Sequence, residues 1–232
     1  MRILGIAGKW LFVLAMPVVL LTASIGWAVN SQWLYEYGFE KYNIGQTTGL
    51  AETELEEAAS GLISYFNSGE DTISTTVIKD GEPFTLFNQR EVAHLRDVKG
   101  LIRLDYWVLL GSAVYVLAYA VTSLLWQKDR RQLAWAVVGG GGTTLGLILL
   151  LGLAAMLNFD QFFLQFHLIS FANDLWLLDP TKDYLIMLFP QGFWRDATMI
   201  IALVATGLAL VLAGAGGAHL FFTGRKAKIN PL

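Results

Sequence analysis

Four long apolar segments constrain this 232-residue chain more than any other feature. A helix needs about 20 mostly apolar residues to cross the hydrocarbon core of a bilayer. The segments 10–29, 104–126, 133–157 and 197–222 each supply such a run. Because 55% of the residues are apolar and only 15% are charged, an ordinary soluble domain is excluded. We expect four transmembrane helices, with the first retained as a signal-anchor because no A-x-A cleavage site closes it.

Positive charges predict the orientation of these spans. Lysine and arginine favour the cytoplasmic side of a membrane, and with four spans all three basic flanks fall on one side. These flanks are Arg2 and Lys9, then Lys128, Arg130 and Arg131, and finally Arg225, Lys226 and Lys228. Both termini are therefore expected in the cytoplasm. In chain order the sequence predicts a cytoplasmic N-terminus with the first span (1–29), an extracytoplasmic cap (30–103), the second span (104–126), a cytoplasmic loop (127–132), the third span (133–157), an interfacial aromatic segment outside the cytoplasm (158–196), the fourth span (197–222) and a cytoplasmic tail (223–232).

The first outer segment is too long to be a plain connection, so it must carry structure of its own. The stretch "TELEEAASGLISYF" (53–66) has helical periodicity and, in Thr53 and Glu56, a capping-box pattern. The stretch "ISTTVIKDGEPFTLF" (73–87) has two β-prone runs around Asp80-Gly81, which indicates a hairpin. The predicted fold class is an α-helical polytopic membrane protein, with four transmembrane helices and a small α+β extracytoplasmic cap.

The second outer segment, 158–196, is dense in Phe and Trp but is interrupted by aspartates and by His167. This pattern cannot span a bilayer. Its helices either lie in the interface with aromatic faces toward lipid, or form ordinary core beneath the cap. Both alternatives place His167 at the boundary between cap and membrane.

Composition excludes several kinds of chemistry. The chain has no cysteine, so it has no disulfide, thiolate nucleophile or Cys-based metal site. It has no long Lys/Arg tract that would indicate a nucleic-acid partner, and no G-x-S-x-G elbow of a serine hydrolase. Small residues inside the spans are expected to permit close helix packing, with Gly142 and Gly146 at small-xxx-small spacing and a stripe of Ala202, Ala205, Ala209 and Ala213.

The stretch "REVAHLRDVKGL" (90–101) leads into the second span and carries one of only three histidines. On a helix, Glu91 falls inside an apolar stripe and His94 at its edge. A carboxylate on a buried face needs a partner, so Glu91 is predicted to orient His94, with Asp97 a weaker candidate. Arg96 and Lys99 project from the opposite side, where they could meet lipid headgroups or substrate phosphate.

His94 and His167 are the two histidines expected outside the cytoplasm, whereas His219 near the end of span four is expected to be structural. With no evident nucleophile, the pair indicates acid–base catalysis: one imidazole takes a proton from an attacking α-amine and the other donates to a departing alkoxide. An aromatic-lined pocket at the headgroup level would confine a lipid substrate. Its expected lining is Phe163, Phe166 and Trp176.

Two alternatives remain open. The first is a zinc-dependent membrane hydrolase, with His94, His167 and two carboxylates as ligands, although no H-x-x-H or H-x-x-x-H pair anchors such a site. The second is a non-catalytic accessory or scaffold protein whose cap binds a partner. The primary prediction includes neither a metal nor a cofactor.

Three motifs and the order of the spans together carry a resemblance. The motifs are "NQREVAHLRDVKGL", "FHLISFANDLWLLDPTKDYLIMLFP" and the "GFWRDA" entry to span four. Over nearly the whole chain, they resemble the bacterial lipoprotein intramolecular transacylase family. The resemblance implies an enzyme of the bacterial cell membrane whose partners are diacylglyceryl-modified lipoproteins and membrane lipid.

The implied reaction moves the sn-2 acyl chain of an S-diacylglyceryl lipoprotein to the α-amino group of its N-terminal cysteine. It passes through a cyclic tetrahedral intermediate and yields a lyso-form lipoprotein. By motif, the family's two catalytic histidines fall on His94 and His167.

Overall fold

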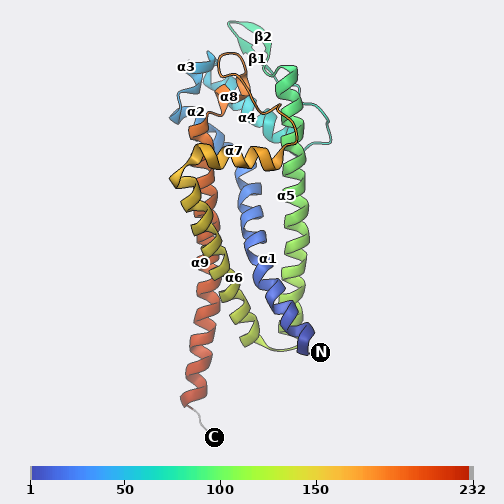
Figure 1. Cartoon of the computed structure of the whole chain (residues 1–232), viewed down its shortest axis with the longest axis vertical. Helices are drawn as coiled ribbons and strands as arrows, with labels where there is room; N and C mark the ends of the chain where they lie inside the picture. Colours follow the sequence, from blue (N-terminus) through green and yellow to red (C-terminus); the bar gives the residue numbers. More distant parts are fainter. Residues whose placement is uncertain (1, 230–232) are drawn as a thin grey trace. The chain divides into compact units, whose positions relative to one another are not determined.

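The computed structural model describes residues 2–229 of the chain, with side chains described for residues 6–225 (Figure 1). Four long helices dominate the described part: α1 (Arg2–Val29), α5 (Gln89–Val121), α6 (Arg130–Leu157) and α9 (Gln191–Ile229). A single π-helical stretch, η1 (Thr122–Trp126), continues α5. Each of the four contains a segment long and apolar enough to cross a membrane. The predicted basic flanks include Arg2, Lys226 and Lys228, whose side chains lie outside the described residues.

The chain divides into two compact units. Unit 1 comprises Met1–Ile25, Asp105–Leu153 and Ile200–Leu232, which is most of the length of the four long helices. Unit 2 comprises Gly26–Leu104 and Ala154–Met199. Both predicted site histidines therefore belong to unit 2.

Unit 1 is held together by close helix packing. An added Cβ at Gly141 of α6 would lie 2.8 Å from the Cβ of Ala213 on α9, so only glycine permits this approach. Ala205 and Ala209 of the predicted alanine stripe are fully buried. The prediction for Gly142 and Gly146 is wrong, because a Cβ added at either position would meet no atom of a neighbouring helix within 4 Å. The contact face of α6 carries Gly140 and Gly141 instead.

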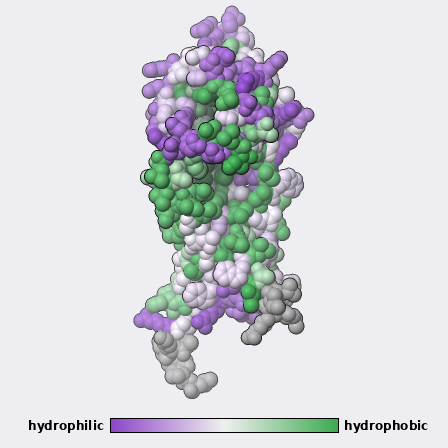
Figure 2. Space-filling model, in the orientation of Figure 1, coloured by the Kyte–Doolittle hydropathy of each residue, from purple (hydrophilic) through white to green (hydrophobic). Residues whose placement is uncertain are grey.

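The outward surface of unit 1 is apolar. Many large side chains of the long helices are exposed, among them Leu117, Leu150, Leu203 and Val211. On the face drawn in Figure 2, hydrophobic residues cover much of the long helices, whereas hydrophilic residues gather over the hairpin. Such a surface matches the solvent of a bilayer rather than water.

The first part of unit 2 mixes helices with one hairpin. The helices are α2 (Gln32–Lys41), α3 (Ile44–Thr48) and α4 (Glu52–Asn67), and the strands are β1 (Thr76–Lys79) and β2 (Glu82–Thr85). The strands pair antiparallel, and the turn residues Asp80 and Gly81 have φ angles of 54° and 82°. Two positive φ angles identify a type I′ hairpin turn and confirm the predicted hairpin. The capping box is wrong: α4 begins at Glu52, after Ala51, which makes no side-chain cap.

The rest of unit 2 holds α7 (Phe159–Ser170) and α8 (Tyr184–Leu188). The side chain of Asn158 caps α7 by accepting a hydrogen bond from the Gln161 N–H at 3.0 Å. Phe159 and His167 are buried, whereas Phe166, Leu168 and Ile169 are exposed. One face of α7 thus belongs to the core of unit 2, and the other face is apolar and exposed.

Candidate active site

Two histidines from distant parts of the sequence meet in unit 2. His94 lies in the second turn of α5 and His167 in the last turn of α7. Their ring centroids are 6.4 Å apart and the ring planes are inclined by 26°. Both residues are buried, with exposed fractions of 7% and 9%. The two predicted catalytic groups are therefore close enough to act on one bound molecule.

Aromatic rings surround the histidine pair. The ring centroid of His167 lies 4.4 Å from that of Phe163, 4.8 Å from Trp176 and 5.4 Å from Phe166. Phe171 contacts both histidines, at 5.1 Å from His94 and 5.6 Å from His167. The three aromatic residues expected from the sequence are thus beside the pair. Phe171 was missed, although its spacing of four residues from His167 is a helical-neighbour signal.

Hydrogen bonding distinguishes the two rings. Nδ1 of His167 lies 2.8 Å from the carbonyl oxygen of Phe163. A carbonyl only accepts, so this nitrogen carries the proton, and in a neutral ring Nε2 then offers a lone pair. Nδ1 of His94 is buried and has no hydrogen-bond partner among the described residues. A buried polar atom without a partner is costly, and a bound substrate group would satisfy it.

Burial keeps both imidazoles neutral. The apolar run of α5 begins at Leu104, so His94 lies in the charged first turns of the helix, outside the predicted span. Burial, with a smaller effect from nearby His167, lowers the His94 pKa to about 4. Burial also lowers the pKa of His167, against the opposing effect of its bond to the Phe163 carbonyl. Near neutral pH each ring is therefore able to accept a proton.

The two predicted orienting carboxylates make other contacts. Glu91 is buried, and its oxygens accept hydrogen bonds from the N–H groups of Leu185 and Asn88 rather than from His94. Burial raises the pKa of this carboxyl group, and the two N–H bonds oppose that change. Asp97 accepts a hydrogen bond from the Asn173 side chain at 2.8 Å, and its charge raises the His94 pKa. The orienting role of each stays a prediction.

The two predicted cationic substrate contacts differ from one another. Arg96 is exposed, as its helix face predicts. Lys99 is 2% exposed, which corrects the prediction that it projects away from the packed face. Its ammonium donates to the Ser68 hydroxyl and the Glu70 carbonyl and lies 4.0 Å from the Tyr65 ring centroid. The reason is that the α4 end and the loop after it cover this side of α5.

Residues 171–183 form a loop that we call the strap, which hydrogen bonds with Asn88 and with the first turns of α5 hold near the histidines. The Arg90 guanidinium donates to the Asp174 carbonyl, and Asp97 holds Asn173. At the far end, the Asn88 amide donates to Asp183 at 2.8 Å. The strap carries Trp176 against His167. Sequence analysis missed Arg90, Asn88 and Asn173, since each bond joins positions far apart in the chain.

The described residues contain no group of three or more His, Cys, Asp or Glu side chains arranged to hold a metal ion.

The protein-family model for "Lipoprotein intramolecular transacylase Lit" matches residues 10–194, which is most of the chain. The chain belongs to this transacylase family. The expected family, the class of acyltransferase and the lipoprotein as substrate are thereby confirmed, as is the helical membrane fold with four candidate spans.

Solved structures of a family member share this fold. The lipoprotein intramolecular transacylase Lit from Bacillus cereus superposes with a TM-score of 0.83 over 97% of this chain and 100% of that one, at 20% identity. Its histidine-to-arginine variant gives a TM-score of 0.79, also at 20% identity, over 97% of this chain and 95% of that one. An uncharacterized protein of Aquifex aeolicus (strain VF5) is 25% identical over 198 residues, covering 84% of this chain and 86% of its own length.

Proposed function

We propose that this transacylase moves the sn-2 acyl chain of an S-diacylglyceryl lipoprotein to the α-amino group of its N-terminal cysteine, with His94 and His167 as the acid–base pair. The observation that carries the proposal is the pair of neutral, buried imidazoles with ring centroids 6.4 Å apart. Membership of the family supplies the lipoprotein and the acyl transfer. The site supplies groups that can move the protons.

The proposed reaction needs no co-reactant. The amine nitrogen attacks the ester carbonyl and forms a C–N bond, the tetrahedral intermediate collapses, and the ester C–O bond breaks. One proton leaves the nitrogen and one reaches the departing glyceryl oxygen. Because both rings start neutral, the proton taken from the amine balances the proton given to the alkoxide, and the pair of rings ends the reaction neutral. No enzyme nucleophile is required, which agrees with the absence of cysteine.

The two rings are suited to passing that proton in different ways. His167 is tied to the Phe163 carbonyl through Nδ1, so its exchange with substrate takes place at Nε2. His94 has an unpartnered Nδ1, so it can receive a proton at one nitrogen and release one from the other. General acid–base assistance of this kind contributes roughly 10²–10⁴-fold to a rate.

Confinement supplies the rest of the proposed rate enhancement. Phe163, Phe166, Phe171 and Trp176 leave little freedom to a lipid beside the histidines. When both reacting groups belong to one molecule, correct orientation can lower the barrier by about 7–11 kcal/mol. The burial of both imidazoles beside these rings also limits the access of water that would hydrolyse the ester.

The proposed topology places this site outside the cytoplasm. Lys9, the loop residues Lys128, Arg130 and Arg131, and Arg225 mark one side of the four spans. Residues 30–103 and 158–196 then lie on the other side of the membrane. Labelling of single cysteines introduced at Gly81 and Lys128 by a membrane-impermeant reagent tests the topology. Labelling of the loop position in intact cells would overturn it.

A regiospecific label tests the reaction. A model lipopeptide with a free α-amine carries a heavy acyl chain at sn-2 and a light chain at sn-1, and fragment masses report where each chain resides. With the enzyme, the heavy chain is expected in amide linkage. Retention of both chains on glycerol, or appearance of the light chain on nitrogen, would reject the proposal.

A further inference from the structure

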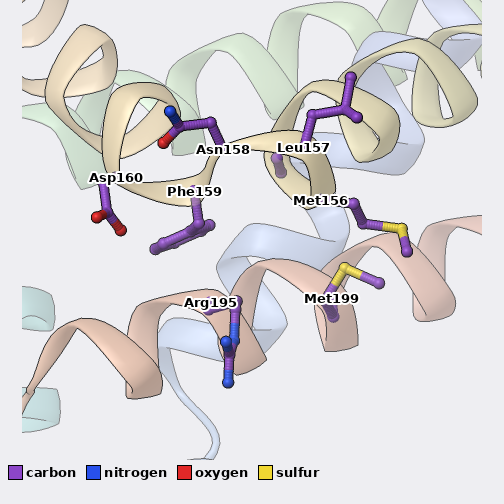
Figure 3. Close-up of a pocket in the computed structure, with 8 residues that line it drawn as sticks. Met156, Leu157, Asn158, Phe159, Asp160, Arg195 and Met199 are labelled. Atoms are coloured by element: carbon purple, nitrogen blue, oxygen red, sulfur yellow. The ribbon is translucent and has the colours of Figure 1, made fainter.

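A cavity of about 460 Å³ lies where α6 ends, α7 begins and α9 completes its first turns. All of its lining residues belong to unit 2. Met156, Phe159 and Met199 supply apolar walls, and Asp160 and Arg195 supply charge (Figure 3). The volume falls in the range of small-ligand sites.

This cavity is separate from the histidine site. Phe159 begins α7 and His167 lies in its last turn, so the two are about 12 Å apart along the helix axis. Neither histidine lines the cavity. None of the chemistry proposed above uses Asp160 or Arg195.

The two charges are unneutralised in the described part of the chain. Arg195 is exposed and makes no hydrogen bond or ion pair there, and in Figure 3 its guanidinium extends away from Asp160. The adjacent Asp196 is engaged elsewhere, with Lys41 at 2.6 Å and Tyr42 at 2.7 Å. Asp160 accepts one hydrogen bond, from the Gln191 amide at 2.8 Å, and has no cationic partner.

The predicted ends of the third and fourth spans place the cavity at the level of the lipid headgroups. The apolar run of α6 ends at Leu157, which is 86% exposed, and the fourth span is expected to begin at 197. An arginine at this level meets lipid phosphate, and exposed methionine and leucine beside it meet acyl chains.

We propose that the cavity binds a phospholipid with a phosphoethanolamine headgroup, whose phosphate pairs with Arg195 and whose primary ammonium pairs with Asp160. Charge complementarity selects this class. A purely anionic headgroup leaves the Asp160 carboxylate without a cationic partner. A choline headgroup has no N–H group that could donate a hydrogen bond to this carboxylate. Met156 and Met199 contact the upper parts of the acyl chains.

Native mass spectrometry of the full-length protein tests the site, with ethanolamine, glycerol and choline phospholipids of identical chains supplied in equal amounts. Wild type is expected to retain the ethanolamine lipid preferentially. Arg195→Gln removes the phosphate contact and weakens retention of all three lipids, by roughly three- to fivefold, the upper range for an exposed ion pair. Asp160→Ala removes both the charge and the hydrogen-bond acceptor, so it reduces retention of the ethanolamine lipid to the level of the choline lipid.

Controls separate this site from general lipid binding. Arg195→Lys keeps the cation and most of the retention. Arg131→Gln, in the first turn of α6 at the end remote from the cavity, leaves retention unchanged. Equal retention of the glycerol and ethanolamine lipids by wild type would contradict the proposal, as would wild-type retention in both cavity variants. Glycerophosphoethanolamine without chains is expected to compete poorly, and equal competition would identify a soluble phosphate ester as the ligand instead.

Discussion

The carboxylate of Glu91 accepts a hydrogen bond from the Leu185 N–H at 2.6 Å, which joins the first turn of α5 to the first turn of α8. Its other oxygen accepts from the Asn88 N–H at 2.7 Å, and the residue is 1% exposed. Both oxygens are thus committed to backbone groups. Glu91 therefore joins α5 to α8, a role that its position on the apolar stripe did not predict.

Glu91→Gln is expected to lower the free energy of unfolding by about 1–3 kcal/mol, because the new NH₂ group would face a backbone N–H and leave it unpaired. Thermal unfolding in detergent measures the change. Glu82→Gln, at an exposed position on β2, is the matched control and should melt like wild type. If Glu91 served only to orient His94, its variant would instead lose activity at an unchanged melting temperature.

The bond between Asp97 and Asn173 is expected to hold the strap, and with it Trp176, in place. Asp97→Ala and Asn173→Ala should each lower kcat/KM roughly two- to tenfold, the worth of one hydrogen bond of about 0.5–1.5 kcal/mol. Asp97→Asn retains an oxygen that accepts from Asn173 and should keep most of the activity. An Asp97→Asn variant as weak as Asp97→Ala would show that charge, not the tether, matters.

The free energy of unfolding should decrease as the pH is lowered toward the pKa of His94 in the folded protein. The folded His94 pKa is lowered from 6.5 to about 4, so between these values the unfolded chain binds a proton that the folded chain does not. The contribution of His94 to the free energy of unfolding is therefore fully present above pH 6.5. It is lost as the pH falls toward 4, by up to about 1.4 kcal/mol per pH unit. His94→Asn removes this contribution and should flatten the fall in melting temperature. Equal slopes for both proteins would contradict the buried, neutral state of His94.

Adjacent glycines of α6 should respond to alanine in opposite directions. At Gly141 the new methyl group would lie 2.8 Å from the Cβ of Ala213 and 3.0 Å from the Ala209 carbonyl oxygen, which we expect to cost about 1–3 kcal/mol. At Gly142 nothing lies within 4 Å, so alanine should be neutral or stabilising by up to about 1 kcal/mol. Melting temperatures of the two variants in one detergent decide the matter. A destabilised Gly142→Ala would restore the packing face predicted from sequence.

Sequence patterns found the features that depend on nearby residues. Apolar length identified the long helices, and Asp80-Gly81 identified the hairpin because the positive φ angles of a type I′ turn select these residues. The helical stripe of α5 correctly predicted that Glu91 is buried, whereas it placed His94, which is also buried, at the edge of the stripe. The sequence also predicted that the two histidines lie near each other, because it placed both beside the end of a span on the same predicted side of the membrane.

Contacts between distant segments were beyond the same patterns. Lys99 was assigned to an exposed basic face, because a helical wheel does not show that the residues after α4 cover it. The partner of Asp97 is a side chain of the strap, and strap geometry follows from packing rather than periodicity. The contacting face of α6 differs from the predicted one, because spacing alone does not say which side of a span faces its neighbours.

Single-turnover transfer of the labelled sn-2 chain in histidine variants tests the central claim most directly. His94→Ala and His167→Ala should each slow the appearance of the heavy chain on nitrogen by at least about 10²-fold, the lower bound for general acid–base assistance. Leu168→Ala, beside His167 but 56% exposed, should react like wild type, and all three must melt as cooperatively as wild type does. A folded variant of either histidine that transfers the chain at the wild-type rate would contradict the account.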